Sequence, residues 1–158
     1  TMSLFIGSLS FVRDERWSQQ PPASKMRLAE FSTEDGCAIV VFDDLGAIKP
    51  GETPTDDMVK ANLDRWTSQV AGSDGSPAAP TIETHQVGGL DITCLESTGT
   101  YQDGMPGGPK TPRTDTTFRG MVIRTPSDLY FIRMIGPKSA MEGHAEAWKR
   151  MRETMRVH

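Results

Sequence analysis

Residues 118–135, FRGMVIRTPSDLYFIRMI, decide the fold, because two apolar runs flank a four-residue turn. Both runs, 118–124 and 129–135, are rich in aromatic and β-branched side chains, as strands are. The TPSD between them suits a turn, since its proline sets φ and its serine and aspartate can bond nearby backbone groups. The stretch predicts two adjacent antiparallel strands.

A helix-forming stretch, residues 139–156, follows this hairpin after Gly136-Pro137 ends its second strand. Its apolar side chains recur at helical spacing, and Ser139 with Glu142 forms a capping-box pattern at its start. Gly143 interrupts the pattern at a cost of about 1 kcal/mol relative to alanine. The helix should therefore depend on packing against one face of the sheet.

The rest of the chain supplies further strands and another helix. Strands are predicted over residues 4–12, 26–31, 37–42, 81–87 and 90–101. The last two are joined across Gly88-Gly89, a pair that permits the positive φ of a two-residue turn. A helix is predicted over residues 56–70, with Thr55 as its N-cap and Gly72 as a left-handed stop.

Length and charge narrow the class of protein. At 158 residues the chain is expected to form one domain, 1–158. The net charge of -4 gives no electrostatic reason to expect nucleic acid or an anionic membrane as a partner. No apolar run has the length of an integral membrane segment. Compartment and oligomeric state stay open, and export is an alternative if a signal has been removed.

The chain contains no recognisable catalytic motif, so no catalytic residue and no cofactor are predicted. Cys37 and Cys94 lack metal-type or redox-type spacing and are expected to be free thiols, with a disulfide as the alternative. Arg119, Arg124 and Arg133 could form a basic surface, although such arginines more often lie over apolar neighbours.

Four aspartates form the alternative metal site: Asp43, Asp44, Asp56 and Asp57. Carboxylates of this kind could hold a hard cation and support a metal-assisted enzyme. Against this, acids are expected in the first turn of a helix because of the helix dipole, and the ligand spacing of a calcium loop is absent.

A long irregular segment is predicted over residues 102–116, which are rich in glycine and proline. Loops of this length are often functional, so we expect it to contact another protein. Aromatic, methionine and arginine side chains are enriched in interface cores. The interaction residues predicted on this basis are Tyr101, Met105, Lys110 and Arg113.

Several packing and turn motifs carry a resemblance to a known family. They are Trp17 with Pro21-Pro22, then Met26-Arg27-x-Ala29-x-Phe31, Arg65-Trp66-x-x-Gln69 and Gly136-Pro137. In these motifs and their order the chain resembles uncharacterised bacterial proteins with the Mog/PsbP-like fold, several of which are exported or lipid-anchored. The resemblance implies an α+β protein: an α/β/α sandwich with a mostly antiparallel sheet flanked by two main helices.

Relatives with that fold include a Ran-binding nuclear import factor and extrinsic subunits of the oxygen-evolving photosystem, which work by binding. The resemblance therefore favours a non-enzymatic module. Together with the absence of a catalytic motif and the long loop, this predicts a soluble, non-catalytic accessory or protein-interaction domain whose partner is another protein. The alternatives are a metal-assisted enzyme and a small-ligand-binding domain. Fold alone does not transfer a binding site, so no residue role comes from the family.

Overall fold

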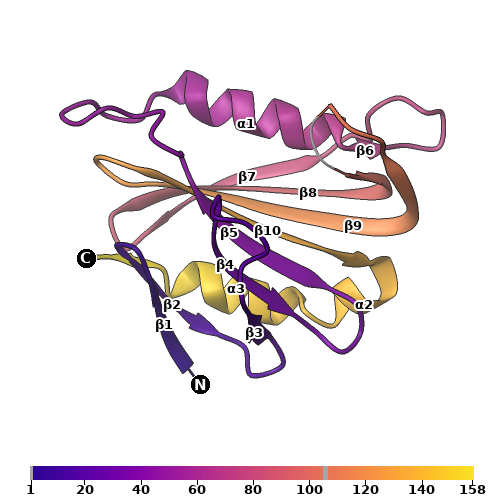
Figure 1. The fold of residues 1–158 in the computed structure, drawn as a ribbon, viewed down its shortest axis with the longest axis horizontal. Helices are drawn as coiled ribbons and strands as arrows, with labels where there is room; N and C mark the ends of the chain where they lie inside the picture. The colour runs from indigo at the N-terminus through magenta and orange to yellow at the C-terminus, as the bar shows by residue number, and fades with distance from the viewer. Residues whose placement is uncertain (1, 105–106) are drawn as a thin grey trace.

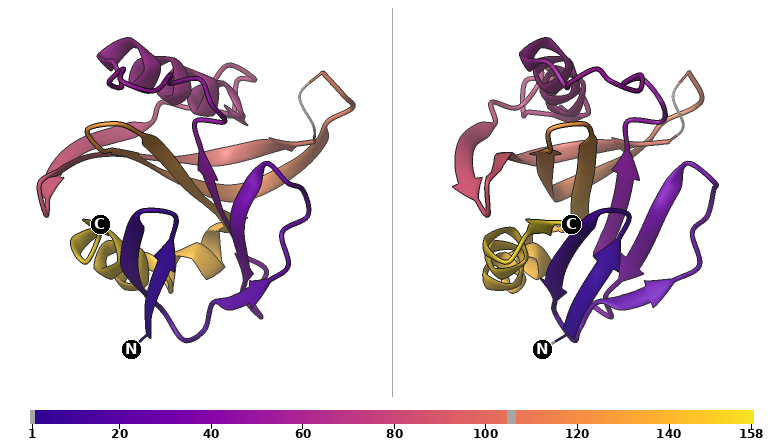
Figure 2. Two further views of the ribbon diagram at one scale, coloured as in Figure 1. Left: turned by 60° about the vertical axis from the view of Figure 1, so that its left-hand side comes forward. Right: turned by 90° about the vertical axis from the view of Figure 1, so that its left-hand side faces the viewer.

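The computed structural model describes residues 2–104 and 107–158. Its middle layer is an eight-stranded sheet with the order β3-β4-β5-β10-β9-β8-β6, and β7 pairs with β8 beside this path. Helix α1 lies over one face of the sheet, and helices α2 and α3 lie over the other (Figures 1 and 2). A second sheet, ordered β1-β2-β11, packs beside α3 (Figure 2). The predicted α+β sandwich is confirmed.

The strands of the large sheet are β3 (Ser18–Gln20), β4 (Arg27–Ser32), β5 (Ala38–Asp43), β6 (Val70–Ala71), β7 (Thr81–Val87), β8 (Leu90–Asp103), β9 (Thr111–Arg124) and β10 (Leu129–Pro137). The small sheet contains β1 (Met2–Ile6), β2 (Leu9–Arg13) and β11 (Arg156–Val157). The helices are α1 (Asp56–Ser68), α2 (Lys138–Glu142) and α3 (Ala145–Glu153). Every strand pair among the described residues is antiparallel.

The β9–β10 hairpin forms as predicted. Its turn is closed by the amide of Thr125, which donates to the carbonyl of Asp128 at 3.0 Å, and by the amide of Asp128, which donates to Thr125 Oγ1 at 2.8 Å. Because successive side chains of a strand point to opposite faces, the hairpin contributes to both layers. Met121 packs on the α3 side, whereas Val122 packs on the α1 side.

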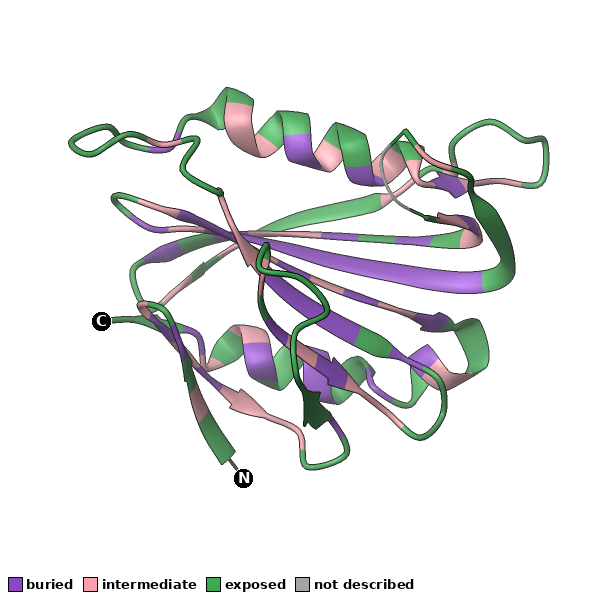
Figure 3. Cartoon of the chain, in the orientation of Figure 1, coloured by how far each residue is buried: buried purple, intermediate pink, exposed green. Residues whose placement is uncertain are grey.

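Two hydrophobic cores result, one on each face of the sheet. The core under α1 centres on Trp66, whose ring lies 5.5 Å from the ring of Phe118. The larger core joins the small sheet, α2, α3 and the opposite face of the large sheet, and includes Trp17, Trp148 and Met151. The two cores explain why the long strands are buried in the middle of the molecule (Figure 3).

Three local predictions at chain ends and caps were wrong. Residues 4–12 form a hairpin, not one strand, because the chain reverses at Gly7, whose φ is 59°. The helix predicted to start with a capping box begins after Pro137 with no side-chain cap, so Ser139 and Glu142 do not form the box. Helix α1 is capped by Thr55 as predicted, but it ends at Gln69 in a right-handed conformation, not at Gly72.

The helix predicted over residues 139–156 is divided into α2 and α3 at Gly143 and His144. The prediction of a loop over residues 102–116 was also wrong, because β8 continues to Asp103 and β9 begins at Thr111. Main-chain ladder bonds hold this part of the sheet together. Residues 111–115 are all exposed, so this end of β9 lacks the apolar alternation that predicts a strand.

Candidate functional site

A two-stranded arm extends from the sheet where β8 and β9 continue beyond the last residues that pair with β6 and β10 (Figures 2 and 3). The arm consists of residues 101–103 and 111–115. Strand β10 pairs with β9 only as far as Thr116, and β6 pairs with β8 only at Thr100 and Tyr101. Residues 111–115 are all exposed. The amide of Gln102 donates to the carbonyl of Gln69 at the end of α1, at 2.9 Å, and beyond this point the arm is held by the pairing of its own two strands.

A β-bulge lies at the base of the arm. The register changes between Gly99 and Tyr101, so that Thr114 and Asp115 together oppose Thr100. Asp115 has a φ of 46°, in the left-handed region that costs an L-residue about 1–2 kcal/mol. Bulges bend a strand and redirect the residues beyond it. The direction of the arm thus depends on a strained backbone geometry, and such strain clusters at functional sites.

The predicted interaction residues have different positions in the structure. Arg113 and Lys110 are exposed, and Arg113 Nη2 pairs with Asp103 Oδ2 at 2.7 Å. Tyr101 is only 6% exposed and packs in the α1 core beside Phe118, so its assignment as a surface anchor was wrong. Burial raises the pKa of its hydroxyl group. Met105 lies outside the described residues.

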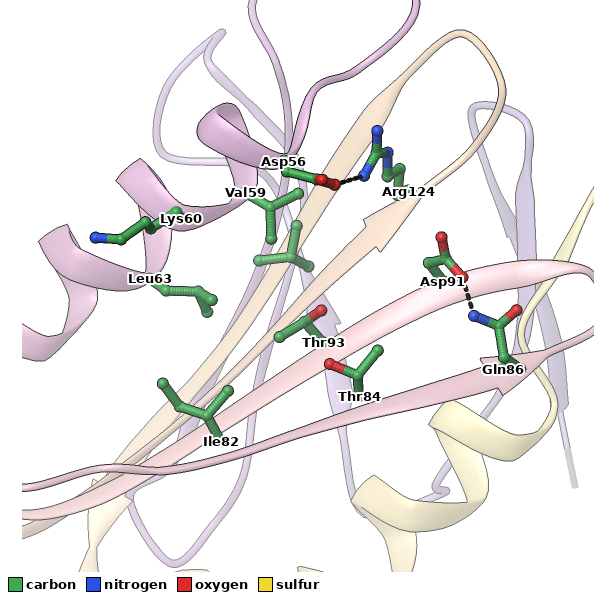
Figure 4. A pocket seen from close by; sticks show the side chains of 11 residues that line it. Asp56, Val59, Lys60, Leu63, Ile82, Thr84, Gln86, Asp91, Thr93 and Arg124 are labelled. Carbon is green, nitrogen blue, oxygen red and sulfur yellow. Dashed lines mark hydrogen bonds and ion pairs between the residues drawn. The ribbon is translucent and has the colours of Figure 1, made fainter.

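An open cleft of about 440 Å³ lies between α1 and the β7 side of the sheet (Figure 4). Thr84, Thr93 and Val122 lie side by side across β7, β8 and β9 and form its floor. Val59 and Leu63 of α1 form one apolar wall. Ligand sites commonly combine such apolar walls with a few polar groups.

Polar groups close one end of the cleft. Arg124 Nη1 donates to Asp56 Oδ1 at 2.5 Å, and its Nη2 donates to the carbonyl of Pro54 at 2.5 Å. Asp91 lies opposite Arg124 on the neighbouring strand at this same end, and Gln86 Nε2 donates to Asp91 Oδ1 (Figure 4). The cleft therefore offers threonine hydroxyl groups on its floor beside an apolar wall, which suits an uncharged molecule of mixed polarity.

The four aspartates of the alternative metal site are not gathered into a ligand group in the described part of the chain. Asp43 and Asp44 accept hydrogen bonds from the amides of Leu45 and Ile48, at 2.8 and 2.9 Å. Asp56 is paired with Arg124 at the end of the cleft, and Asp57 is exposed in the first turn of α1. They serve as turn and helix-start acceptors, the roles favoured by the helix dipole.

The three arginines of the β9–β10 hairpin do not form a basic surface. Arg119 Nε pairs with Glu96 Oε1 at 2.5 Å, and its Nη1 donates to the carbonyl of Met141 at 2.8 Å. Arg133 lies over the ring of Phe42, at 5.1 Å. Burial lowers its pKa. Since Arg119 and Arg133 occupy opposite faces of the sheet, no single anionic partner could contact both.

A cluster that the sequence does not reveal forms around His144, which is 1% exposed. Trp17 Nε1 donates to His144 Nδ1 at 3.1 Å, and His144 Nε2 lies 3.0 Å from Asp35 Oδ2. Hydrogen bonds from Thr33 and then His144 lower the pKa of Asp35. Cys37 lies close enough to complete a group of three possible metal ligands with Asp35 and His144, the one such group among residues 2–104 and 107–158.

The hydrogen bonds define what this cluster can do. Because the indole of Trp17 can only donate, His144 Nδ1 is the acceptor and Nε2 carries the proton that faces Asp35. A metal bound to Nε2 would displace that proton to Nδ1, where it would face the N–H group of Trp17, so that two donors would oppose each other. His144 likewise has no free nitrogen to accept a proton from Cys37, and burial raises the pKa of that thiol. The arrangement suits a structural hydrogen-bond chain.

Both cysteines are free, as predicted, with Cys37 buried and Cys94 half-buried. Burial also raises the pKa of the Cys94 thiol. A buried thiol of raised pKa is a weak nucleophile at neutral pH. None of the helices in the described residues is long and apolar enough to span a bilayer.

No protein-family model matches the chain, and no curated protein matches it either. Solved structures do resemble it. LpqN, involved in cell envelope biogenesis of Mycobacterium tuberculosis, has a TM-score of 0.58 and 11% identity over 94% of this chain and 82% of its own. A Bacteroides thetaiotaomicron protein has a TM-score of 0.54 and 16% identity, covering 98% of this chain and 47% of its own.

The third similar structure is cyanobacterial PsbP (CyanoP) from Synechocystis sp. PCC 6803. Its TM-score is 0.53 with 12% identity, over 96% of this chain and 87% of its own. At such identities the likeness concerns the fold and not the activity. The chain therefore has a PsbP-like fold, shared with LpqN and CyanoP.

Proposed function

We propose that this chain is a non-catalytic accessory domain that binds another protein through the arm. The observation that carries the proposal is the arm itself, in which five consecutive residues, 111–115, are exposed beyond the last residue that pairs with β10. An isolated two-stranded ribbon is marginally stable in water. Here the bulge lies at its base, and the arm bends toward the C-terminal end of α1 (Figure 1).

Two further observations support this proposal. The buried cluster around His144 has the hydrogen-bond pattern of a structural element, which leaves no general base beside Cys37. LpqN, a structural neighbour, is involved in cell envelope biogenesis. We extend the proposal to an exported or envelope location on that basis, and fractionation of cells that produce the chain from its natural gene tests it.

The arm is tested with a truncated variant in which residues 103–111 are replaced by Asn-Gly, a dipeptide that closes a two-residue hairpin, and in which the remaining Arg113 is changed to alanine. The control is Thr93→Arg, which places a bulky cation in the cleft and leaves the arm intact. We expect the wild-type chain and the control to capture the same partner from extract of the source cells. The truncated chain should lose that partner.

A photo-crosslinking residue introduced in place of Arg113 tests the contact directly, because this side chain is exposed on the arm. Crosslinks to the captured partner from this position, and not from exposed Asp57 on α1, would support the proposal. Capture by the truncated chain at the wild-type level would contradict it.

A small-ligand site in the cleft is the second candidate, favoured by its volume of about 440 Å³, which falls within the range of about 300–1,000 Å³ found for ligand pockets. A thermal-shift screen of uncharged polar metabolites tests it. A ligand that raises the Tm of the wild type but not of Thr93→Arg would support this candidate. The absence of any such ligand, with partner capture intact, would favour the arm.

A further inference from the structure

Strand β7 forms an open edge of the large sheet. It pairs with β8 over its full length, Thr81–Val87, and no other strand in residues 2–104 and 107–158 pairs with it. Soluble proteins usually protect such an edge with charged side chains, above all lysine, with proline or with a bulge. The β7 sequence, TIETHQV, contains neither lysine nor proline, its one acidic side chain is Glu83, and its register with β8 is unbroken. This edge is therefore open to another strand.

The turn between β7 and β8 shows which main-chain groups are free. Val87 pairs with Leu90 across Gly88 and Gly89, whose φ angles are 56° and 79°. In a two-residue hairpin the flanking residues share hydrogen bonds, and bonded pairs then alternate along the ladder. The main-chain N–H and C=O groups that point away from β8 are therefore those of Ile82, Thr84 and Gln86.

We propose that β7 pairs antiparallel with β7 of a second copy of this chain, about a two-fold axis at Thr84. In this register Thr84 faces its own copy, and Ile82 faces Gln86 of the second copy. All the outward groups then meet as hydrogen-bonded pairs, with about six main-chain bonds across the axis. The large sheet becomes continuous through the dimer.

Neighbouring registers are less favourable. An axis between two residues would place an outward amide opposite an inward one, which the antiparallel ladder does not allow. An axis at Glu83 would place Glu83 opposite its own copy and bring Gln86 opposite Pro80, which has no N–H group. An axis at His85 would bring Ile82 opposite Gly88 in the turn. Axes at Ile82 and Gln86 would bring Thr84 opposite the same two residues, Pro80 and Gly88. Only the axis at Thr84 uses the whole strand.

The side chains of the non-bonded pairs are complementary in this register. Glu83 lies opposite His85 of the second copy, and symmetry repeats the pair. Within one copy His85 Nε2 is buried and makes no hydrogen bond, although Glu83 Oε2 lies 3.4 Å away. Facing side chains are closest at such positions, where opposite charges stabilise and like charges destabilise the sheet. The second copy thus supplies a carboxylate for this imidazole.

In the dimer, side chains of the second copy also cover the other face of β7. Ile82 is 48% exposed and lies at the mouth of the cleft. In the dimer the side chain of Gln86 from the second copy lies beside it. This proposal goes beyond the function of the arm, because it uses different residues and a different partner.

Sedimentation equilibrium from micromolar to millimolar protein tests the dimer. Thr84→Pro removes the outward N–H while the inward bonds to β8 remain, a position where an edge strand tolerates proline. Thr84→Val keeps the N–H and is the matched control. We expect the wild type and the control to dimerise, and Thr84→Pro to raise the dimer Kd at least about tenfold.

A charge exchange tests the register without altering the backbone. His85→Glu places like charges opposite each other and should weaken the dimer, whereas Glu83→His with His85→Glu restores complementary pairs and should recover it. Circular dichroism confirms that each variant is folded. A wild type that stays monomeric at millimolar concentration would overturn the proposal. The open edge of β7 would then be a candidate for pairing with a strand of another protein. Equal dimerisation of Thr84→Pro and Thr84→Val would overturn it as well.

Discussion

The imidazole of His144 is held from two sides by residues distant in sequence, Trp17 and Asp35. Trp17→Phe keeps an aromatic ring in the core but leaves the buried Nδ1 of His144 without its donor. A buried acceptor that loses its partner costs about 1–3 kcal/mol. We expect the free energy of unfolding, measured by urea denaturation, to fall by that amount.

The control for this prediction is Trp148→Phe, which removes the same ring atoms from the same hydrophobic core. Trp148 contributes packing alone, so the difference between the two variants isolates the hydrogen bond. Equal losses of stability would mean that the contact between Trp17 and His144 contributes little.

Gly120 is required where β9 passes beneath α1, because an added Cβ would lie 2.3 Å from Trp66 Cζ3. The ring cannot move freely, since it also packs against Phe118 and Phe131. Overpacking of this kind destabilises a core by about 1–3 kcal/mol. We expect Gly120→Ala to lower the urea midpoint accordingly.

Gly143→Ala is the control for that prediction, because it makes the same substitution at a position where a Cβ fits. Gly143 has a φ of -70°, and its Cβ would lie 3.4 Å from the carbonyl of Ala140, so alanine fits. A compatible glycine-to-alanine change stabilises a protein by about 0.4–1 kcal/mol. A loss of stability here similar to that of Gly120→Ala would contradict the steric explanation.

At the scale of elements, side chains hold the division between α2 and α3 in place. Arg119 Nη1 donates to the carbonyl of Met141, and Arg16 Nη1 donates to the carbonyl of Gly143 at 3.0 Å. The carbonyl of Met141 also accepts from the amide of His144 at 3.1 Å, so the arginines add to the backbone bonds at this helix end. His144, bound to Trp17 and Asp35, follows directly. The division is therefore a consequence of contacts with β9 and with the N-terminal part of the chain.

The bulge of β9 leads to a prediction about the arm. Asp115→Val places a β-branched residue in the left-handed region, whereas Asp115→Gly relieves the strain. We expect the arm amides, followed by hydrogen exchange, to exchange about 5- to 30-fold faster in the valine variant, as a cost of about 1–2 kcal/mol implies. The glycine variant should protect them at least as well as the wild type. Unchanged exchange in both would show that the bulge does not stabilise the arm.

At the scale of the molecule, two carboxylates link stability to pH. The pKa of Asp14 is held below its ordinary value of 3.8 by its hydrogen bond from Arg16, and that of Asp35 by hydrogen bonds from Thr33 and His144. Both groups are easier to protonate in the unfolded chain. Their stabilisation is complete above the unfolded pKa and disappears as the pH falls through the folded values.

We therefore expect the free energy of unfolding to decrease as the pH falls below about 4. Asp35→Asn should make this decrease smaller, because it removes one of the carboxyl groups whose pKa is lowered in the folded chain. Asp57→Asn removes the same charge from the exposed start of α1 and serves as the control. Urea unfolding at several pH values gives the slopes, and an unchanged slope in Asp35→Asn would contradict this explanation.

The sequence by itself determined the parts whose signals are local. The β9–β10 hairpin follows from two apolar runs around TPSD, and the β7–β8 turn follows from Gly88-Gly89. The start of α1 follows from the side chain of Thr55, which accepts from the amide of Met58 at 3.2 Å. Together these elements account for an antiparallel α+β fold, because turn and cap chemistry acts within a few residues.

Only the tertiary structure decided the features that depend on distant segments. Trp17 and His144 are 127 residues apart in sequence, so no spacing could predict their hydrogen bond. Tyr101 has the composition of an interface anchor but is buried under α1, and the open edge of β7 depends on which strands pair. Periodicity reports whether a side chain alternates between faces, whereas burial and free edges depend on how the sheet is assembled.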